Sequence, residues 1–491
     1  MQKTFSGGTV PDGIKKIPAA GERRWIDSME KQENTANCCR AGFASVDLRA
    51  VLLPEKKNAT PIESVGLFTE DPVSGESAFL FVSDFMDFDL ATVQILEEAV
   101  KDSLPQKCSI HILTTHNHGG EVCDKLDMVQ YGKLASLCAE KARCAAQEAL
   151  VRSVHVQADP DLTMTRRLDL PETGGSATCF YGIAPESRRN GGPFAEHFLN
   201  GLREGTYPYT GGDSLQKIPY HPFPEGDRDL FGMEFISRKN GRTLGTVVRY
   251  AAHAVCCNDG KYYSADYPYF LREKMKSHFS GAPSLFLNGP CGEIAPCLYK
   301  KSLETARTFG ETLAQTLLAP LQKQPFRVLE HFSGALKTVS LPVRQEIFSG
   351  NFEVPEQDWK TLSLPERKKY FETLNFRGSL PFLNAKYRNG EKTAPGNTVE
   401  VKLGLLRFNE TLLLCFPGET FFATGRKICH AFPHTDLVTL TEHGRTVMYL
   451  PPEEEFHKGG YEAVCKLTAA HAEKVLQESA ADFIKSFLAK R

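Results

Sequence analysis

The chain has 491 residues, of which 41% are hydrophobic and 24% are charged, and its formal net charge is −2. This composition is typical of a globular protein with a large core, and the balanced charge without runs of like sign argues against a nucleic-acid-binding surface. No apolar stretch reaches the length of about 18 residues that predicts a transmembrane helix. The oligomeric state is left open by these properties.

Two further properties bear on the compartment. The N-terminal segment, as given, has no apolar core of a secretory signal. The 14 cysteines are scattered without a C-x-x-C pair, so we interpret them as buried, reduced thiols. Together these properties predict a cytoplasmic protein, or a secreted one if a signal has been trimmed.

Residues 1–36 are polar and predict a poorly packed lead-in, with a single domain over 37–491. Hydrophobic patterning then predicts these elements in the first part of the chain: strands at 41–47 and 78–82, a helix at 91–101, a buried strand at 108–115 and a helix at 133–151. Residues 171–228 are rich in Gly, Pro, Asn and Ser, which indicates long loops.

In the second part, the pattern predicts strands at 233–237, 244–252 and 284–288, helices at 267–278 and 302–318, the latter capped by Ser302, strands at 400–408 and 411–416, and a closing helix at 461–488. Residues 345–398 are polar and interrupted by Pro and Gly, which predicts an insertion. The alternation of strands and helices favours an α/β fold, with mixed α+β as the alternative, in which helices flank mixed sheets.

Three residues with metal-binding side chains stand at or just past the ends of apolar strands: His116, His253 and Glu419. Strand ends at the rim of a sheet are where α/β proteins build their sites, and two imidazoles with a carboxylate are a common zinc set. A lone histidine at a strand end is also compatible with a purely structural, hydrogen-bonded role. His118 follows His116 at alternate spacing, which by itself is a weak metal signal.

The chain reads T-T-H-N-H-G-G at residues 114–120. This segment is similar to the T-H-T-H-S-G-P signature of neutral/alkaline ceramidases and their bacterial relatives, and several other segments resemble motifs of the same family in the same order along the chain. The other similar segments are A-G-F-A-S-V-D at 41–47, D-L-F-G-M-E-F at 229–235 leading to A-H-A at 252–254, S-A-D-Y-P at 264–268, N-G-P-C-G-E-I-A-P at 288–296, F-P-G-E at 416–419, Y-L-P-P at 449–452 and G-G-Y-E at 459–462.

The resemblance implies a zinc-dependent hydrolase that cleaves the amide bond of an N-acyl compound, either a ceramide-like lipid amide or a smaller amide, with metal-activated water. Carried over residue by residue, the zinc ligands are His116, His253, Glu419 and Tyr449. His118 is then the candidate proton donor or a residue that orients its loop. The family also has an arginine near its substrate, which implies that Arg166 or Arg167 lies near the site.

Two departures from the family pattern limit what the resemblance implies. Ala295 stands where ceramidases often have Ser, and Glu293 replaces an Asp, so no serine nucleophile is available from that loop. The sequence as given ends soon after the G-G-Y-E segment, so we expect a bacterial-type relative without the immunoglobulin-like domain that follows the catalytic domain in many ceramidases. Two alternatives remain open: a non-catalytic metal-binding descendant, and a zinc esterase or peptidase. Cys291 is a weaker candidate nucleophile in its tight turn.

Overall fold

The computed structural model describes residues 37–52, 57–120, 126–178, 192–206, 226–257, 262–297, 301–349, 353–388 and 397–489. Cys38–Arg491 forms one compact unit, and the expected lead-in at 1–36 lies outside the described residues. None of the helices in these ranges has the length and apolar character that a membrane crossing requires.

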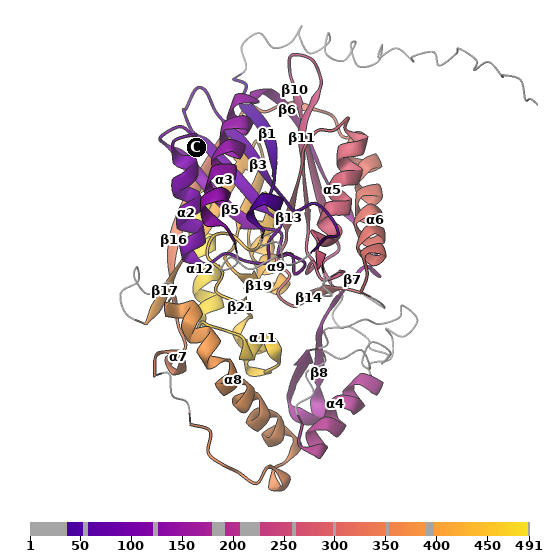
Figure 1. Ribbon diagram of the computed structural model, residues 1–491, viewed down its shortest axis with the longest axis vertical. Coiled ribbons are helices and arrows are strands. Elements are labelled where there is room, and N and C mark those ends of the chain that lie inside the picture. Colours follow the sequence, from indigo (N-terminus) through magenta and orange to yellow (C-terminus); the bar gives the residue numbers. More distant parts are fainter. Residues whose placement is uncertain are drawn as a thin grey trace, which may run out of the picture. The chain divides into compact units, whose positions relative to one another are not determined.

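A large mixed sheet runs through the unit (Figure 1). Its strands, in spatial order, are β13 (Ser284–Asn288), β11 (Thr243–Tyr250), β10 (Asp229–Ser237), β6 (Gln147–Gln157), β1 (Arg40–Asp47), β3 (Glu63–Glu70), β4 (Ser77–Ser83) and β5 (Cys108–Thr114), and β15 (Arg327–Val328) also pairs with β6. Most neighbours are antiparallel, but β4–β5 and β11–β13 are parallel.

A second, smaller sheet packs against one face of the first. It is formed by β16 (Phe332–Pro342), β17 (Thr398–Phe408), β18 (Thr411–Cys415) and β20 (Asp436–Leu440), of which β18 and β20 are parallel. The two sheets meet in one apolar core, where Phe43 and Phe235 of the large sheet join Phe408 of the small one. The ring centroids of Phe235 and Phe408 lie 5.6 Å apart.

Short two-stranded ladders surround the ends of these sheets. They are β2 (Lys57–Asn58) with β12 (Tyr262–Tyr263), β7 (Thr163–Thr165) with β14 (Ile294–Pro296), β8 (Arg167–Leu170) with β9 (Gly175–Thr178), and β19 (Glu419–Thr420) with β21 (Tyr449–Leu450). The β19–β21 ladder places Glu419 directly opposite Tyr449.

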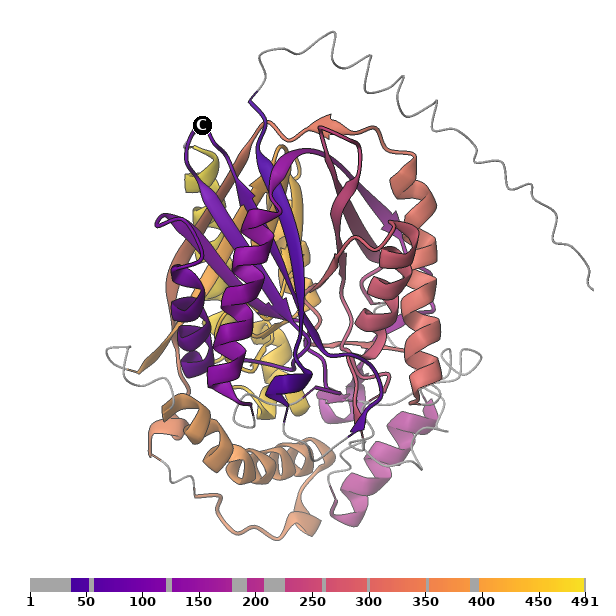
Figure 2. The ribbon, with the colours of Figure 1, turned by 45° about the horizontal axis from the view of Figure 1, so that its top comes forward.

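Helices cover the outer faces of both sheets, which gives an arrangement of helices, sheet, sheet and helices (Figures 1 and 2). The helices are α2 (Leu90–Lys101), α3 (Met128–Cys144), α4 (Gly192–Glu204), α5 (Asp266–His278), α6 (Leu303–Gln322), α7 (Gln345–Ser349), α8 (Leu364–Arg388), α9 (Phe422–Ala431), α10 (Glu453–His457), α11 (Tyr461–Val464) and α12 (Ala472–Leu488), with 3₁₀ turns η1 (Arg49–Val51), η3 (Pro171–Thr173) and η6 (Trp359–Thr361). Separate apolar clusters seat α2–α3 and α5–α6 on the large sheet, and α8 and α12 on the small sheet.

This mixed architecture confirms the expected fold class. The predicted cap of α6 is also confirmed, because the Ser302 side chain accepts a hydrogen bond from the Thr305 amide at 3.1 Å. All twelve cysteines in the described ranges are free, and Cys138 and Cys415 lie in the core.

Several sequence-based boundaries are wrong. The predicted helix at 133–151 ends at Cys144, and Gln147 already begins the central strand β6. The predicted closing helix at 461–488 is two helices, α11 and α12. Of the predicted loops at 171–228, the described parts contain β9 and α4, and the remainder lies outside the described residues. The polar segment at 345–398 contains the 25-residue helix α8.

Candidate metal centre

The parallel strand pairs of the two sheets end in one region, and the candidate residues follow those ends. His116 comes after β5, His253 after β11 and Glu419 after β18. Glu419 Oε2 lies 3.1 Å from His253 Nε2 and 3.4 Å from His116 Nε2. The three side chains predicted from strand ends are therefore brought together, and all three are buried.

Each histidine is oriented by a backbone carbonyl. His116 Nδ1 lies 3.1 Å from the Met86 oxygen, and His253 Nδ1 lies 2.9 Å from the Ile294 oxygen. Because a carbonyl only accepts, Nδ1 carries a proton in both rings, and Nε2 is the nitrogen that faces Glu419. Two imidazole Nε2 atoms facing one carboxylate form a donor set that suits zinc.

Tyr449 lies beside Glu419 through the β19–β21 ladder. Its hydroxyl accepts a hydrogen bond of 2.9 Å from Arg166 Nη2, and its side chain is buried. Burial raises the pKa of Tyr449 well above its usual value, while the nearby Arg166 cation acts in the opposite direction. The structure thus brings Tyr449, the one predicted ligand that rests on the motif resemblance alone, into the same cluster.

The two candidate arginines take different positions around one buried carboxylate, Glu462. Arg166 Nε donates to Glu462 at 2.8 Å, and its Nη1 lies 3.3 Å from His253 Nε2. Arg167 Nη1 donates to the other Glu462 oxygen at 2.9 Å, but its Nε turns away to Glu455 at 3.0 Å. Arg166 is therefore the arginine that contacts the cluster.

His118 also enters the cluster. Its Nε2 lies 3.3 Å from His116 Nε2, and its backbone amide donates to the Ala254 carbonyl at 3.1 Å. Ligand atoms of His116, His118 and His253 lie within 4.8 Å of one another, so these three imidazoles could hold a metal ion. The sequence leaves His118 open between a proton donor and a residue that orients its loop, and the geometry adds a third possible role as a metal ligand.

Electrostatics show how strongly the cluster attracts positive charge. Burial lowers the pKa of His116, but Glu419 and Glu442 reverse that effect and raise it to about 9. By contrast, burial and the Arg166 cation lower the pKa of His253 to about 4. Burial alone would raise the pKa of Glu419, yet the two imidazoles bring it well below its usual value. A proton on His116 or a metal cation would each balance the buried carboxylates.

Sequence reasoning missed Glu442, the carboxylate behind His116. Its Oε1 lies 3.6 Å from His116 Nδ1, and its Oε2 accepts from Thr446 at 2.8 Å. Burial raises its pKa to about 7. His116 and Glu442 both have a positive φ, 54° and 60°, so the backbone is strained on both sides of this contact. Glu442 follows β20, which was not among the predicted strands, and with that strand assigned the strand-end criterion would also have found it.

Asn288 was also missed as a support for the centre. Its Nδ2 donates to the Thr115 carbonyl at 3.2 Å, and its Oδ1 accepts from the Ala252 amide at 3.3 Å. These two backbone groups belong to the residues immediately before His116 and His253. One buried carboxamide therefore connects the two histidine-bearing loops, and the motif at 288–296 gave no signal of this role.

The glycines of the H-N-H-G-G segment allow close packing against the S-A-D-Y-P segment. A Cβ on Gly119 would lie 2.5 Å from the Ser264 carbonyl oxygen, and one on Gly120 would lie 2.6 Å from the Asp84 oxygen. The Asn117 side chain fills the same junction and donates to the Ser264 carbonyl at 2.6 Å. The two motifs thus meet, although they are far apart in sequence.

Cys291 lies in the turn that approaches Glu419 from the other side. Its thiol is buried, and burial together with Glu419 and Glu442 raises its pKa well above the usual value. A thiol held in its neutral form is a poor nucleophile. Gly292 donates its amide to the Thr420 carbonyl at 3.1 Å, which supports the alternative role of this turn as a backbone support.

Comparison with known proteins gives a consistent picture of the fold. No family model matches the chain, and no curated protein matches it by sequence. A solved structure of neutral ceramidase from Pseudomonas aeruginosa is similar, with a TM-score of 0.61 and 15% identity over 91% of this chain and 74% of that one. A ceramidase complexed with C2 is similar with a TM-score of 0.60 and 14% identity over the same shares. The chain has the neutral ceramidase fold.

This finding confirms, at the level of the fold, the resemblance that the ordered motifs predicted. At 15% identity the likeness establishes the arrangement of the elements and not the chemistry. The roles of His116, His118, Arg166, His253, Glu419 and Tyr449 therefore rest on their geometry and on the motif resemblance.

Proposed function

We propose that the protein is a zinc-dependent hydrolase that cleaves the amide bond of an N-acyl compound. The observation that carries the proposal is the meeting of His116, His253 and Glu419, with both Nδ1 atoms bound to carbonyls and both Nε2 atoms turned to one carboxylate oxygen. Two histidines and a glutamate leave a further coordination position, as catalytic zinc sites require. Neutral ceramidase structures share the fold, which supports an amide as the substrate class.

Tyr449 is the proposed fourth ligand. The Arg166 guanidinium lies 2.9 Å from its hydroxyl and partly opposes burial, which keeps the phenol neutral, so the phenol would ionise only with a metal ion bound. Its position opposite Glu419 in the β19–β21 ladder fixes the two oxygen ligands relative to each other. His118 is the proposed proton donor to the leaving amine, and a fifth ligand is its alternative role.

A bound zinc ion polarises an amide carbonyl and activates water as the nucleophile. The residues of this chain supply the rest. Arg166 holds a buried positive charge beside His253, where negative charge would develop on the carbonyl oxygen. Glu462 keeps that guanidinium in place through a hydrogen bond of 2.8 Å. Burial lowers the pKa of His118 well below its usual value, so its neutral imidazole would first accept the proton of the attacking water and then donate it to the leaving amine.

The proposed substrate is a ceramide-like lipid amide or a smaller N-acyl amide. Ala295 stands where the similar segment of ceramidases often has a serine, so the proposal relies on water and not on a side-chain nucleophile. The two competing functions are an esterase or peptidase with the same metal, and a metal-binding protein without catalysis. A panel of N-acyl amides, esters and peptides separates the first from amidase activity.

Metal analysis of protein purified without added metal tests the proposal directly. We expect about one equivalent of zinc per chain, and His253→Ala to abolish both zinc binding and amide hydrolysis. His278→Ala is the control, because this histidine lies at the exposed end of α5 and should change neither. A His253→Ala protein that loses zinc but still hydrolyses amides would contradict the mechanism. Zinc retained without any hydrolysis in the unmodified chain would favour the non-catalytic alternative.

A further inference from the structure

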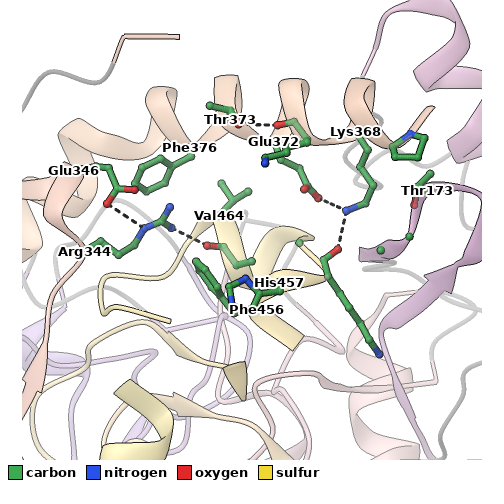
Figure 3. A pocket seen from close by; sticks show the side chains of 17 residues that line it. Thr173, Arg344, Glu346, Lys368, Glu372, Thr373, Phe376, Phe456, His457 and Val464 are labelled. Carbon is green, nitrogen blue, oxygen red and sulfur yellow. Dashed lines mark hydrogen bonds and ion pairs between the residues drawn. The ribbon is translucent and has the colours of Figure 1, made fainter. Parts of the chain in front are cut away.

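Apart from the candidate metal centre, a cavity of about 480 Å³ lies between α8 and the α10–α11 segment, next to the turn that joins η3 to β9. Figure 3 shows its side chains pointing inward from these elements, with α8 along one wall and Phe456 opposite. Its volume is within the range of small-molecule sites in proteins, which is roughly 300–1,000 Å³. Its lining shares no residue with the candidate metal centre.

The cavity is cationic. Its lining has four basic side chains and two acidic ones, a formal balance of 4 − 2 = +2 with His457 neutral: Arg344, Lys368, Lys369 and Lys458 against Glu346 and Glu372. A concave surface with an excess of positive charge attracts anions.

Two of the three lysines in the lining, Lys368 and Lys458, are already bound to the protein. Lys368 Nζ donates to Glu372 at 2.7 Å and to the Lys458 carbonyl at 2.8 Å. Lys458 Nζ turns to Glu455 at 2.8 Å. These contacts hold the wall in shape and leave little capacity for a ligand.

Arg344 differs from these lysines. Its side chain is only 13% exposed, yet the Glu346 carboxylate lies 3.9 Å from its Nε, beyond hydrogen-bonding distance. Its Nη1 donates to the Ala463 carbonyl at 3.0 Å. A guanidinium has more N–H donors than these contacts use. Burial accordingly lowers the pKa of Arg344 to about 10, an effect that Glu346 only partly offsets.

Aromatic rings fix the orientation of this arginine. The guanidinium carbon lies 3.5 Å from the centre of the Phe376 ring and 5.4 Å from that of Phe456. Stacking on a ring face leaves the N–H groups at the edge of the guanidinium in the plane, and Figure 3 shows two of its nitrogens directed at Glu346 and at the Ala463 carbonyl. That edge matches the two oxygens of a carboxylate.

We propose that this cavity binds a carboxylate-bearing amphiphile, with Arg344 pairing the carboxylate and Phe376, Phe456 and Val464 contacting the apolar chain. Two observations favour a singly charged carboxylate over a phosphate dianion. Glu346 and Glu372 line the same cavity and repel a second negative charge, and the aromatic rings provide apolar surface that a free phosphate cannot use. This assignment does not depend on the proposed amide hydrolysis.

The cavity is connected to the metal centre through α11. Arg344 binds the Ala463 carbonyl, and Glu372 accepts from the Gly460 amide at 2.7 Å, so both ends of this short helix contact cavity residues. The same helix carries Glu462, which binds Arg166, and Tyr461, whose ring lies 5.5 Å from that of Tyr449. An occupant that competes for Arg344 therefore acts on the helix that supports the centre.

Isothermal titration of the full-length protein with octanoate tests the assignment, with octanol and inorganic phosphate as comparison ligands. We expect octanoate to bind more tightly than either, because only octanoate combines one negative charge with an apolar chain. Arg344→Gln should weaken octanoate binding by at least about tenfold, since a charged hydrogen-bonded pair is lost. Arg307→Gln is the matched control: Arg307 also stacks on a phenylalanine, Phe270, at 4.5 Å and faces Glu311, but on the surface of α6.

A second substitution, at an exposed residue, distinguishes loss of binding from a folding defect in Arg344→Gln. Lys369→Glu changes a solvent-exposed residue of the cavity lining, so the fold should persist while octanoate affinity falls several-fold. Equal octanoate affinity in the unmodified chain and in both cavity variants would overturn the proposal, because any binding would then be at another site. Octanol or phosphate binding as tightly as octanoate would overturn the carboxylate assignment.

Discussion

The arginines that contact α11 differ in how completely their charges are paired. Glu462 gives one carboxylate oxygen to Arg166 and the other to Arg167, and all three side chains are at most 5% exposed. Arg344 also contacts this helix and is 13% exposed, but its ion-pair partner Glu346 lies 3.9 Å from Nε. A buried cation that is paired within the protein supports structure, whereas one that is incompletely paired is available to a ligand.

The largest loss of folding stability should come from removing the Glu462 carboxylate. Glu462→Gln leaves Arg166 and Arg167 buried with a neutral partner, and loss of one member of a buried ionic network costs about 3–5 kcal/mol. We expect the free energy of unfolding in urea to fall by that amount.

Glu455→Gln is the control, because Glu455 contacts Arg167 from a partly exposed position and its pair is screened by solvent. Its expected loss is under about 1 kcal/mol. Equal losses in the two variants would mean that the network does not depend on the buried carboxylate.

Removing the Asn288 side chain, which holds the two histidine-bearing loops together, should cause an intermediate loss of stability. Asn288→Ala removes the carboxamide that joins Thr115 and Ala252, and leaving those backbone groups unpaired costs about 1–3 kcal/mol. Because these residues precede His116 and His253, we also expect zinc affinity to fall by about 10–100-fold, as measured by competition with a chelator.

Asn409→Ala is the control that separates a loss of stability from a loss of zinc affinity. Asn409 is a buried amide that binds the Glu330 amide at 3.0 Å and the Val328 carbonyl at 2.8 Å, in the turn between β17 and β18. Its loss should lower stability to a similar degree and leave zinc affinity unchanged. If both variants lose zinc equally, Asn288 has no specific role in positioning the histidines.

The smallest expected effect comes from a charge cluster near the surface. His155 on β6 lies 2.9 Å from Asp229 and 2.9 Å from Asp436, so it bridges the large and small sheets. Burial lowers its pKa, but the two carboxylates outweigh burial and raise the pKa to about 9. The folded value exceeds the usual value of about 6.5, so the added stability is complete below about pH 6.5 and disappears as the pH rises through 9.

The side chain of His155 is 38% exposed, so solvent screening limits the contribution to about 1 kcal/mol or less. The measurement is the difference in melting temperature between the unmodified chain and His155→Gln at several pH values. We expect a small advantage for histidine at pH 6 and none at pH 10. An advantage that increases with pH would contradict this interpretation.

Strand-end reasoning located much of the candidate centre because the sheet edge, and not the local sequence, brings the residues together. His116, His253 and Glu419 each follow a strand whose parallel partner ends at the same edge. Glu442 satisfies the same criterion after β20 and was missed because that strand was not predicted. Arg166 and Arg167 were indistinguishable in sequence, since their difference depends on which side of Glu462 each one occupies.

The incorrect boundaries have tertiary causes. Residues 147–151 continue a helix-forming composition, but β6 lies between β10 and β1 in the sheet, and this pairing overrides local propensity. The expected helix at 461–488 is interrupted where Thr468 pairs with Val343 and Lys466 pairs with Met448. In α8, Pro381 and Gly378 indicated an interruption, yet the helix continues past both and packs Phe376 and Leu383 into the core of the small sheet.

The candidate centre takes its histidines from the large sheet and its carboxylate and phenol from segments beside the small sheet. Neither sheet by itself contains the complete set, and His116 and Tyr449 are separated by most of the chain. Contacts between such distant segments form late in folding, because the closure of long loops has to precede them. Acquisition of metal should therefore report on the docking of the two sheets, and it can serve as a signal for the last step in the folding of the chain.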